Sequence, residues 1–399
     1  MIAARVVAAL SASQLVGWGV TFYTVGVFGD RIVADTGWSR GLVHAGFSLA
    51  LLVMGFVSPA IGRAIDRAGG RRVMAAGSLA GAAGLVALAT AHHLVHWFAA
   101  WVVLGIAMRM SLYDACFAAL VRIDPVGARR AITTVTLSGG LASTVFWFVG
   151  EALAVRLGWR GATLVFAGFA ALTLPLHLAI PAVADRTAPA NARSPAHALP
   201  PPLATTPDDR RAAAILFGVV AVSTSVLASA LAAHLIPLLL ALGLALPTAV
   251  AVSSLRGVGQ SAARFAEFAS GGRLHPLDLA FFACAALPAT LAFAPFAGTS
   301  TAAALVFSIG GGAGNGLVTI ARGSVPLVLF DPHAYGAITG RIGAPAFWFS
   351  ALAPFAVALV LDHGGVGAAL AALAVPAFAA LAAAAALRRR FAPARPIVP

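Results

Sequence analysis

One short segment, residues 252–268, gathers four polar side chains in an otherwise apolar part of the chain. Arg256, Gln260, Arg264 and Glu267 recur at intervals of three and four residues, and residues at these intervals share one face of a helix. Guanidinium groups bind carboxylates through two parallel hydrogen bonds. The stripe therefore indicates anion binding, with Arg256 and Gln260 as candidate solute contacts.

The other two members of this stripe lie nearer the end of the segment. Arg264 and Glu267 are three residues apart, so they can pair with each other. We expect them to be structural or gating partners, whereas Arg256 lies nearer the middle. An arginine at mid-membrane depth is costly, so it is a functional hypothesis by default.

A second arginine, Arg109, lies in the run GIAMRMSLYDA, residues 105–115. On one continuous helix Tyr113 would share its face, whereas Asp114 would lie about 140° away. Arg109 then needs either a structural partner from another helix or an anionic solute, and both interpretations stay open. Asp114 is a candidate proton carrier, and the alternative is a contact with the arginines of a nearby loop.

Three further side chains extend the candidate site. His234 could contact solute or relay a proton, with a hydrogen-bonded core histidine as the alternative. Asn315 is a candidate solute contact on a helical stripe with Arg322. Arg322 and Arg341 could either attract anions to an inner vestibule or extend to the membrane interface.

The composition of the chain indicates whether these residues belong to a soluble protein or to a membrane protein. Of 399 residues, 60% are hydrophobic and 10% are charged, whereas a soluble domain carries about 25% charged residues. Most of the surface must therefore face a lipid bilayer. The net charge of +13 could suggest nucleic acid, but the arginines form short clusters between apolar runs. That pattern is typical of membrane topology, so we expect no nucleic-acid partner.

Twelve apolar runs are long enough to span the bilayer as helices. They lie at residues 6–30, 40–62, 72–91, 95–121, 131–154, 161–182, 212–241, 247–268, 277–296, 301–328, 334–361 and 365–387. The Pro-, Ala- and charge-rich stretch 183–211 is interpreted as a cytoplasmic linker. The sequence thus predicts an all-α integral membrane protein with two six-helix bundles, 1–182 and 212–399.

The arginines also predict the orientation of the chain. With the N-terminus inside, the cytoplasmic connections and ends carry 17 of the 26 arginines and the outer connections carry four. We therefore expect a multi-pass protein with both termini in the cytoplasm.

The connection between the second and third runs reads GRAIDRAGGRR. It resembles the signature loop of the major facilitator superfamily, G-x-x-x-D-R-x-G-[RK]-[RK], although Gly70 stands where that loop has a basic residue. The matching positions are Gly62, Asp66, Arg67, Gly69 and Arg71. The resemblance implies two pseudo-symmetric halves, a solute site near the midplane between them, and a cytoplasmic gate that includes these five residues.

A narrower resemblance concerns the bacterial relatives of the monocarboxylate and oxalate carriers. It rests on the Gly-Trp-Ser-Arg turn at residues 37–40, on HLIP at 234–237 and on Arg256. The basic residue that this branch often has in the outer half of the fourth helix is replaced by Trp101. The Gly-Pro motif typical of antiporters is absent from the fifth helix. This resemblance implies a carboxylate solute and a location in the bacterial cytoplasmic (inner) membrane.

Together these features predict a secondary active transporter that moves a small organic anion by alternating access. Protons are the candidate coupling ion, carried by Asp114 or His234. The alternatives are efflux of a lipophilic or cationic compound and a solute-sensing receptor on a transporter scaffold. No motif predicts an enzyme or a metal site, so we expect no catalytic residue and no cofactor. We expect the protein to act as a monomer.

Overall fold

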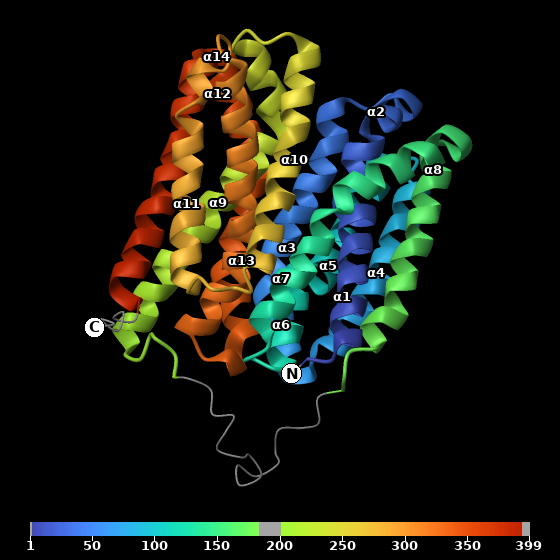
Figure 1. Ribbon diagram of the computed structural model, residues 1–399. Coiled ribbons are helices and arrows are strands. Elements are labelled where there is room, and N and C mark those ends of the chain that lie inside the picture. Colours follow the sequence, from blue (N-terminus) through green and yellow to red (C-terminus); the bar gives the residue numbers. More distant parts are fainter. Residues whose placement is uncertain (1, 183–200, 393–399) are drawn as a thin grey trace. The chain divides into compact units, whose positions relative to one another are not determined.

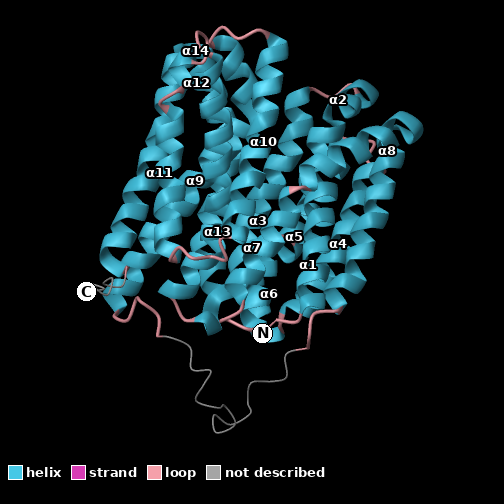
Figure 2. Cartoon of the chain, viewed as in Figure 1, coloured by secondary structure: helices cyan, strands magenta, loops and turns pink. Residues whose placement is uncertain are grey.

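The computed structural model describes residues 2–182 and 201–392, and all regular elements of this part are helical (Figures 1 and 2). The chain forms two compact units. Unit 1 comprises Met1–Pro200 and Asp331–Ala344, and unit 2 comprises Pro201–Phe330 and Pro345–Pro399. Residues 183–200 of the predicted linker lie outside the described residues.

Unit 1 contains the first eight α-helices. They are α1 (Ala4–Gly17), α2 (Thr24–Thr36), α3 (Arg40–Ala68), α4 (Gly70–Ala89), α5 (Leu94–Ser111), α6 (Tyr113–Ile123), α7 (Ala128–Gly140) and α8 (Ala142–Leu178). A π-helical turn, η1 (Trp18–Phe22), joins α1 to α2. The short helix η6 (Pro332–Ala334) and the first turns of α14 (Tyr335–Phe391) also belong to this unit. Helix α4 packs most extensively against α8 and α5.

Unit 2 contains the remaining helices. They are α9 (Pro207–Ala241), α10 (Leu246–Ala269), α11 (Pro276–Leu291), η4 (Ala294–Phe296), α12 (Thr301–Leu305), η5 (Val306–Gly310), α13 (Gly311–Leu329) and α14 from Pro345 onward. The segment η5 is a second π-helical turn. Helix α13 packs extensively against both α11 and α10, so it is the central helix for the candidate residues of this unit.

Nine helical stretches of the described chain are long and apolar enough to cross a membrane. Two of them are kinked at a glycine with positive φ, Gly158 (φ 67°, ψ 170°) and Gly365 (φ 71°, ψ −178°). Positive φ favours glycine because it has no Cβ. Helix α10, with its charged stripe, lies outside the nine. The described helices are consistent with the twelve predicted, and the all-helical membrane architecture is confirmed.

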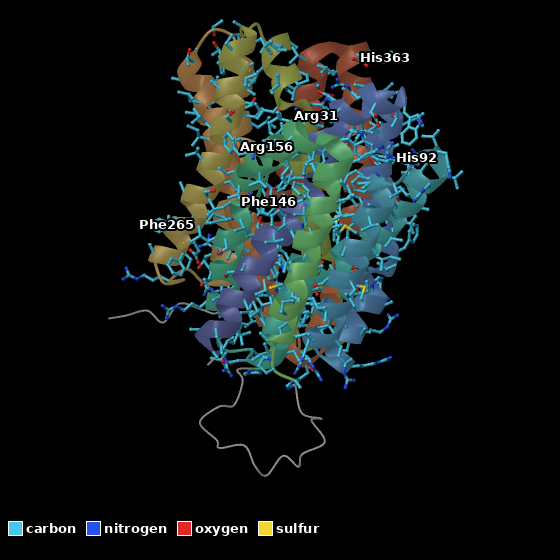
Figure 3. All side chains as sticks on the ribbon, turned by 90° about the vertical axis from the view of Figure 1, so that its right-hand side faces the viewer. Arg31, His92, Phe146, Arg156, Phe265 and His363 are labelled. Carbon is cyan, nitrogen blue, oxygen red and sulfur yellow. The ribbon has the colours of Figure 1, made fainter. Side chains whose placement is uncertain are left out.

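Phe146 and Phe265, both labelled in Figure 3, illustrate the two environments of the aromatic side chains. Phe146 is 5% exposed and packs edge-on against Phe166 within unit 1. Phe265, on α10, is 59% exposed. Apolar side chains in such positions avoid water when lipid tails surround them. The exposed apolar surface therefore fits a chain embedded in a bilayer.

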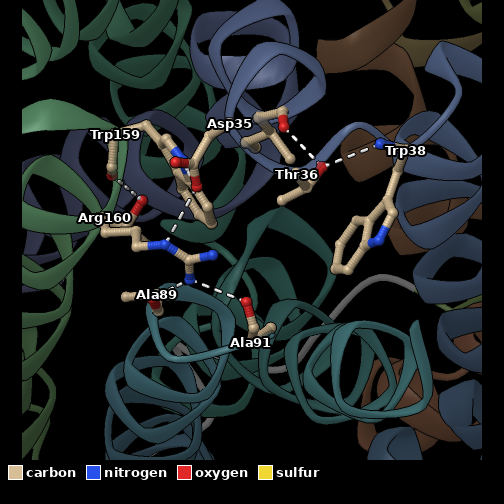
Figure 4. Close-up of polar contacts among 9 residues, drawn as sticks. Asp35, Thr36, Trp38, Ala89, Ala91, Trp159 and Arg160 are labelled. Atoms are coloured by element: carbon tan, nitrogen blue, oxygen red, sulfur yellow. Dashed lines mark hydrogen bonds and ion pairs between the residues drawn. The ribbon is translucent and has the colours of Figure 1, made fainter. Parts of the chain in front are cut away.

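A polar cluster ties the Gly158 turn of α8 to the ends of α2 and α4 in unit 1 (Figure 4). Nη1 of Arg160, in α8 just beyond the Gly158 turn, donates to the carbonyls of Ala89 and Ala91, each over 2.8 Å. Asp35, near the end of α2, accepts from Nε1 of Trp159 at 3.0 Å and from Nε of Arg160 at 3.3 Å. The two bonds from Nη1 of Arg160 satisfy carbonyls at and just beyond the end of α4, where helix carbonyls have no partner within their own helix.

The region of Arg109 differs from the predicted single helix over 95–121. Leu112 is extended (φ −81°, ψ −167°) and separates α5 from α6. Tyr113 therefore does not follow Arg109 at helical spacing, and the argument from a shared face is wrong. Gln14 on α1 compensates the break, because its Nε2 donates to the Ser111 carbonyl over 2.8 Å.

A buried hydroxyl–imidazole cluster joins α4 to α8. Oγ of Ser78 lies 2.7 Å from Oγ1 of Thr173 and 2.7 Å from Nδ1 of His177, and all three residues are buried. We expect Ser78→Ala to destabilise the protein by about 1–3 kcal/mol, because buried polar groups lose a partner. The measurement is the thermal unfolding of purified protein in detergent.

Thr134→Ala is the matched control, since this exposed hydroxyl only donates to a carbonyl of its own helix, that of Arg130. Equal unfolding temperatures for Ser78→Ala and wild type would contradict the stabilising role of the cluster.

Candidate functional site

Arg109, in the last turn of α5, is 2% exposed. Its Nε donates to Oγ of Ser58 on α3 over 2.7 Å, and its Nη2 lies 3.4 Å from the Ser58 carbonyl. Nη1 is buried and makes no hydrogen bond to any described residue. Asp114 and Tyr335 interact with Arg109 electrostatically. The guanidinium therefore retains one donor group that can bind a further acceptor.

The first turns of α14 lie against α3 within unit 1. Asp66 accepts hydrogen bonds from the backbone N–H groups of Gly336 and Ala337, over 2.9 and 2.6 Å. These N–H groups are free to donate to Asp66 because the first N–H groups of a helix have no partner within the helix, and the positive end of the helix dipole attracts an acidic side chain. A Cβ atom on Gly62 would overlap the Gly336 carbonyl. The predicted gate residues Gly62 and Asp66 thus hold the start of α14.

The same contact continues toward Arg109. One helical turn beyond Gly336, a Cβ atom on Gly340 would lie 2.6 Å from the Ser58 carbonyl and 3.3 Å from Nη2 of Arg109. Ser58, which bonds Arg109, is therefore packed against the backbone of α14. The buried arginine and the signature residues belong to one continuous contact between α3 and the start of α14.

The remaining signature residues form the turn into α4. Gly69 has φ 81° and ψ 158°, a conformation that favours glycine. Arg67 is exposed and Arg71 is half-buried. A Cβ atom on Gly70 would overlap Ala119 of α6. This close packing is a physical reason for a glycine where the signature has a basic residue.

Tyr113 and Asp114 start α6. The hydroxyl of Tyr113 donates to the Thr136 carbonyl on α7 over 3.2 Å, so this side chain reaches toward α7. Its ring packs on Trp18, with centroids 4.8 Å apart. Asp114 is half-buried in the first turn of α6. It is the predicted candidate that the structure brings near Arg109.

In unit 2, α10 and α13 run parallel with a register offset of 56 residues. Oγ of Ser308, in η5, donates to the Val252 carbonyl over 2.6 Å. One turn further along each helix, a Cβ on Gly312 would overlap the carbonyl of Arg256. Because Arg264 also donates from Nη2 to Oγ1 of Thr319 over 3.1 Å, the polar stripe of α10 lies along α13.

Arg256 is half-buried, and its Nη1 is buried without a hydrogen bond to any described residue. Among the described residues it forms no ion pair. Gln260 on α10 and Asn315 on α13 are both half-buried. The contact of these three side chains with a solute stays a prediction.

The other predicted residues of unit 2 have protein neighbours. Arg264 and Glu267 are 3% and 5% exposed, and their pairing with each other stays a prediction. Nη1 of Arg322 donates to Oγ of Ser225 on α9 over 2.9 Å. Nε2 of His234 lies 2.7 Å from the Pro354 carbonyl. A carbonyl only accepts, so Nε2 carries a proton.

The family is identified by a match that covers most of the sequence. The sequence profile of the Major Facilitator Superfamily matches residues 9–343. The chain belongs to the major facilitator superfamily. No curated protein matches it. Among solved structures, the human organic anion transporter MFSD10 (TETRAN) resembles it with a TM-score of 0.68 and 16% sequence identity, covering 95% of this chain and 99% of that one. At this identity the likeness shows the fold alone.

Membership of the major facilitator superfamily confirms the predicted fold class. The superfamily consists of transporters of small solutes rather than enzymes, so the protein is a multi-pass membrane protein of a transporter family. The monocarboxylate and oxalate branch stays a prediction.

Several residues of this superfamily member were missed by reasoning from sequence. Ser58 and Gly340 lie at Arg109, and Thr290 and Gly311 lie at Arg256. Only Gly311 had a signal in the sequence, because it belongs to the run GGGAG over residues 310–314. The others are ordinary small residues whose role depends on a neighbour far away along the chain.

Proposed function

We propose that the protein is a secondary active transporter that moves a small organic anion of the carboxylate type by alternating access. The observation that carries the proposal is that each unit contains an arginine, Arg109 or Arg256, whose buried Nη1 makes no hydrogen bond to a described residue. A buried donor without a partner costs free energy, and the cost is larger when the donor is charged. A bound carboxylate would supply the acceptor.

Neighbouring groups support an anionic solute in the same way. Gln260, one helical turn beyond Arg256 on α10, and Asn315 on α13 are the neutral donors proposed to contact the solute in unit 2, and Tyr113 is the one proposed in unit 1. No described carboxylate forms an ion pair with Arg109 or Arg256. The human fold relative is named an organic anion transporter, and that description applies to that protein; in this chain the arginines support an anionic solute.

Proton coupling is proposed through Asp114, with His234 as the second candidate. Asp114 interacts electrostatically with Arg109, so its charge weakens the attraction of Arg109 for an anion. Protonation of Asp114 removes that charge and strengthens anion binding. By thermodynamic linkage, a bound anion then favours the protonated carboxyl by the same factor.

The cytoplasmic gate is proposed to comprise Gly62, Asp66, Arg67, Gly69 and Arg71, together with Arg264 and Glu267. The hydrogen bonds from α14 to Asp66 support the first part of this assignment. The arginine-rich connections support a bacterial inner-membrane protein with both termini in the cytoplasm.

A ligand screen by thermal unfolding tests the anion proposal. Purified protein is heated with acetate, lactate, oxalate or succinate, and separately with tetraphenylphosphonium. A ligand present at 100 times its Kd stabilises the folded state by about 2.7 kcal/mol. We expect such a shift for at least one carboxylate. Stabilisation by the lipophilic cation alone would contradict the proposal and favour cation efflux.

A further inference from the structure

Three consecutive glycines stand where the π-helical turn η5 meets α13, and each is close to a different group. A Cβ atom on Gly310 would lie 2.5 Å from Cγ2 of Thr290 on α11, and one on Gly312 would overlap the Arg256 carbonyl. A Cβ on Gly311, between them, would lie 3.0 Å from Nη1 of Arg256 and 3.6 Å from Oγ1 of Thr290. The guanidinium of Arg256 therefore lies over the bare backbone of Gly311.

This contact matters because no hydrogen bond to a described residue fixes the end of the Arg256 side chain. Its Nη1 is buried and has no described hydrogen-bond partner, and a free arginine side chain can adopt many rotamers. The position of the guanidinium therefore depends on packing. The nearest surface is the bare backbone of Gly311, which a side chain at that position would cover.

We propose that Gly311 is a positioning residue for anion recognition, because its missing side chain lets the Arg256 guanidinium lie between α10, α11 and α13. The anion part of this inference rests on the proposed function. The position of the guanidinium does not, since it follows from residues of unit 2 alone.

The neighbouring glycines provide the controls. At Gly311 an added methyl group meets the far end of a flexible side chain, so the guanidinium moves and the helices stay packed. At Gly312 it meets the backbone of α10, so Gly312→Ala is expected to separate α10 from α13 and lower the unfolding temperature. Gly257, next to Arg256 on α10, has nothing within 4 Å of an added Cβ, so Gly257→Ala is the neutral control.

The first experiment needs no ligand. Phenylglyoxal, which modifies guanidinium groups, is applied to the purified protein, and modification of Arg256 is followed by peptide mass spectrometry. We expect the rate to rise roughly fivefold in Gly311→Ala, as for a side chain forced from its preferred rotamer. In Gly257→Ala the rate should match wild type. An unchanged rate in folded Gly311→Ala would overturn the inference.

The second experiment uses oxalate as the probe and a double-mutant cycle. Gly311→Ala should raise the apparent Kd for oxalate by roughly tenfold, and it should add nothing in the Arg256→Lys background, which has no guanidinium to displace. Additive effects would show that Gly311 acts independently of Arg256 and would overturn the inference. If oxalate fails to bind wild type, the choice of anion fails, while the phenylglyoxal rates still decide the role of Gly311.

Discussion

Arg256→Ala is expected to abolish carboxylate binding while the protein remains folded. Truncating one partner of a buried charge pair costs roughly 2–5 kcal/mol, and removing an uncompensated charge from the membrane relieves a desolvation cost. Arg256→Lys should bind with intermediate affinity, because an ammonium keeps the charge but loses the planar two-donor geometry. The measurements are the oxalate-induced shift in unfolding temperature and uptake into proteoliposomes.

Arg273→Ala is the matched control for this experiment. Arg273 lies exposed in the connection between α10 and α11, so its removal changes the net charge equally without changing the stripe. Normal binding and uptake by Arg256→Ala would show that the stripe is a packing feature, and the anion-site assignment would then be wrong.

Asp66→Ala is expected to loosen the first turn of α14. The amide groups of Gly336 and Ala337 lose a charged acceptor, and hydrogen bonds to charged groups contribute about 1.5–3 kcal/mol. That loss corresponds to a roughly ten- to hundredfold faster hydrogen–deuterium exchange of these amides. The measurement is mass spectrometry of peptides that cover residues 331–344.

Asp124→Ala separates this effect from a general loss of carboxylates in unit 1. The Asp124 side chain accepts from the Val126 amide in the connection before α7, whereas Asp66 accepts from the amides in the first turn of α14. Its removal should leave exchange in 331–344 unchanged. If Asp66→Ala also leaves it unchanged, the carboxylate does not hold α14, and its part in a gate has to be abandoned.

Sequence periodicity predicted the features that depend on one helix at a time. Hydropathy located the helices, and the spacing of Arg256, Gln260 and Arg264 predicted the polar stripe that the structure places along α13. The signature loop indicated Gly62 and Asp66 as gate residues, although it did not indicate their contact with α14. In each case the signal is local, because helix geometry relates residues a few positions apart.

Contacts between distant residues could not be predicted in this way. The break at Leu112 occurs without a proline, and its compensation by Gln14 comes from a residue 97 positions away from Ser111. Ser58 meets Arg109 across 51 residues, and no pattern in either segment indicates the other. The glycine run at residues 310–314 allows either close approach or bending of its helix, and only the packing of α10 and α11 shows that the guanidinium of Arg256 approaches it.

The π-helical turn Val306–Gly310 leaves this region one way to change length during evolution. A π turn holds one residue more than an α turn, so it absorbs an extra residue within a single turn. Loss of one residue here would restore an ordinary helix without rotating the turns on either side. The contact of Gly312 with Arg256, beyond the turn, could then persist, whereas the bond from Ser308 to Val252, within the turn, would have to be replaced. Homologous sequences are therefore expected to lose at most one residue here, whereas the loop 270–275 can accommodate longer insertions and deletions.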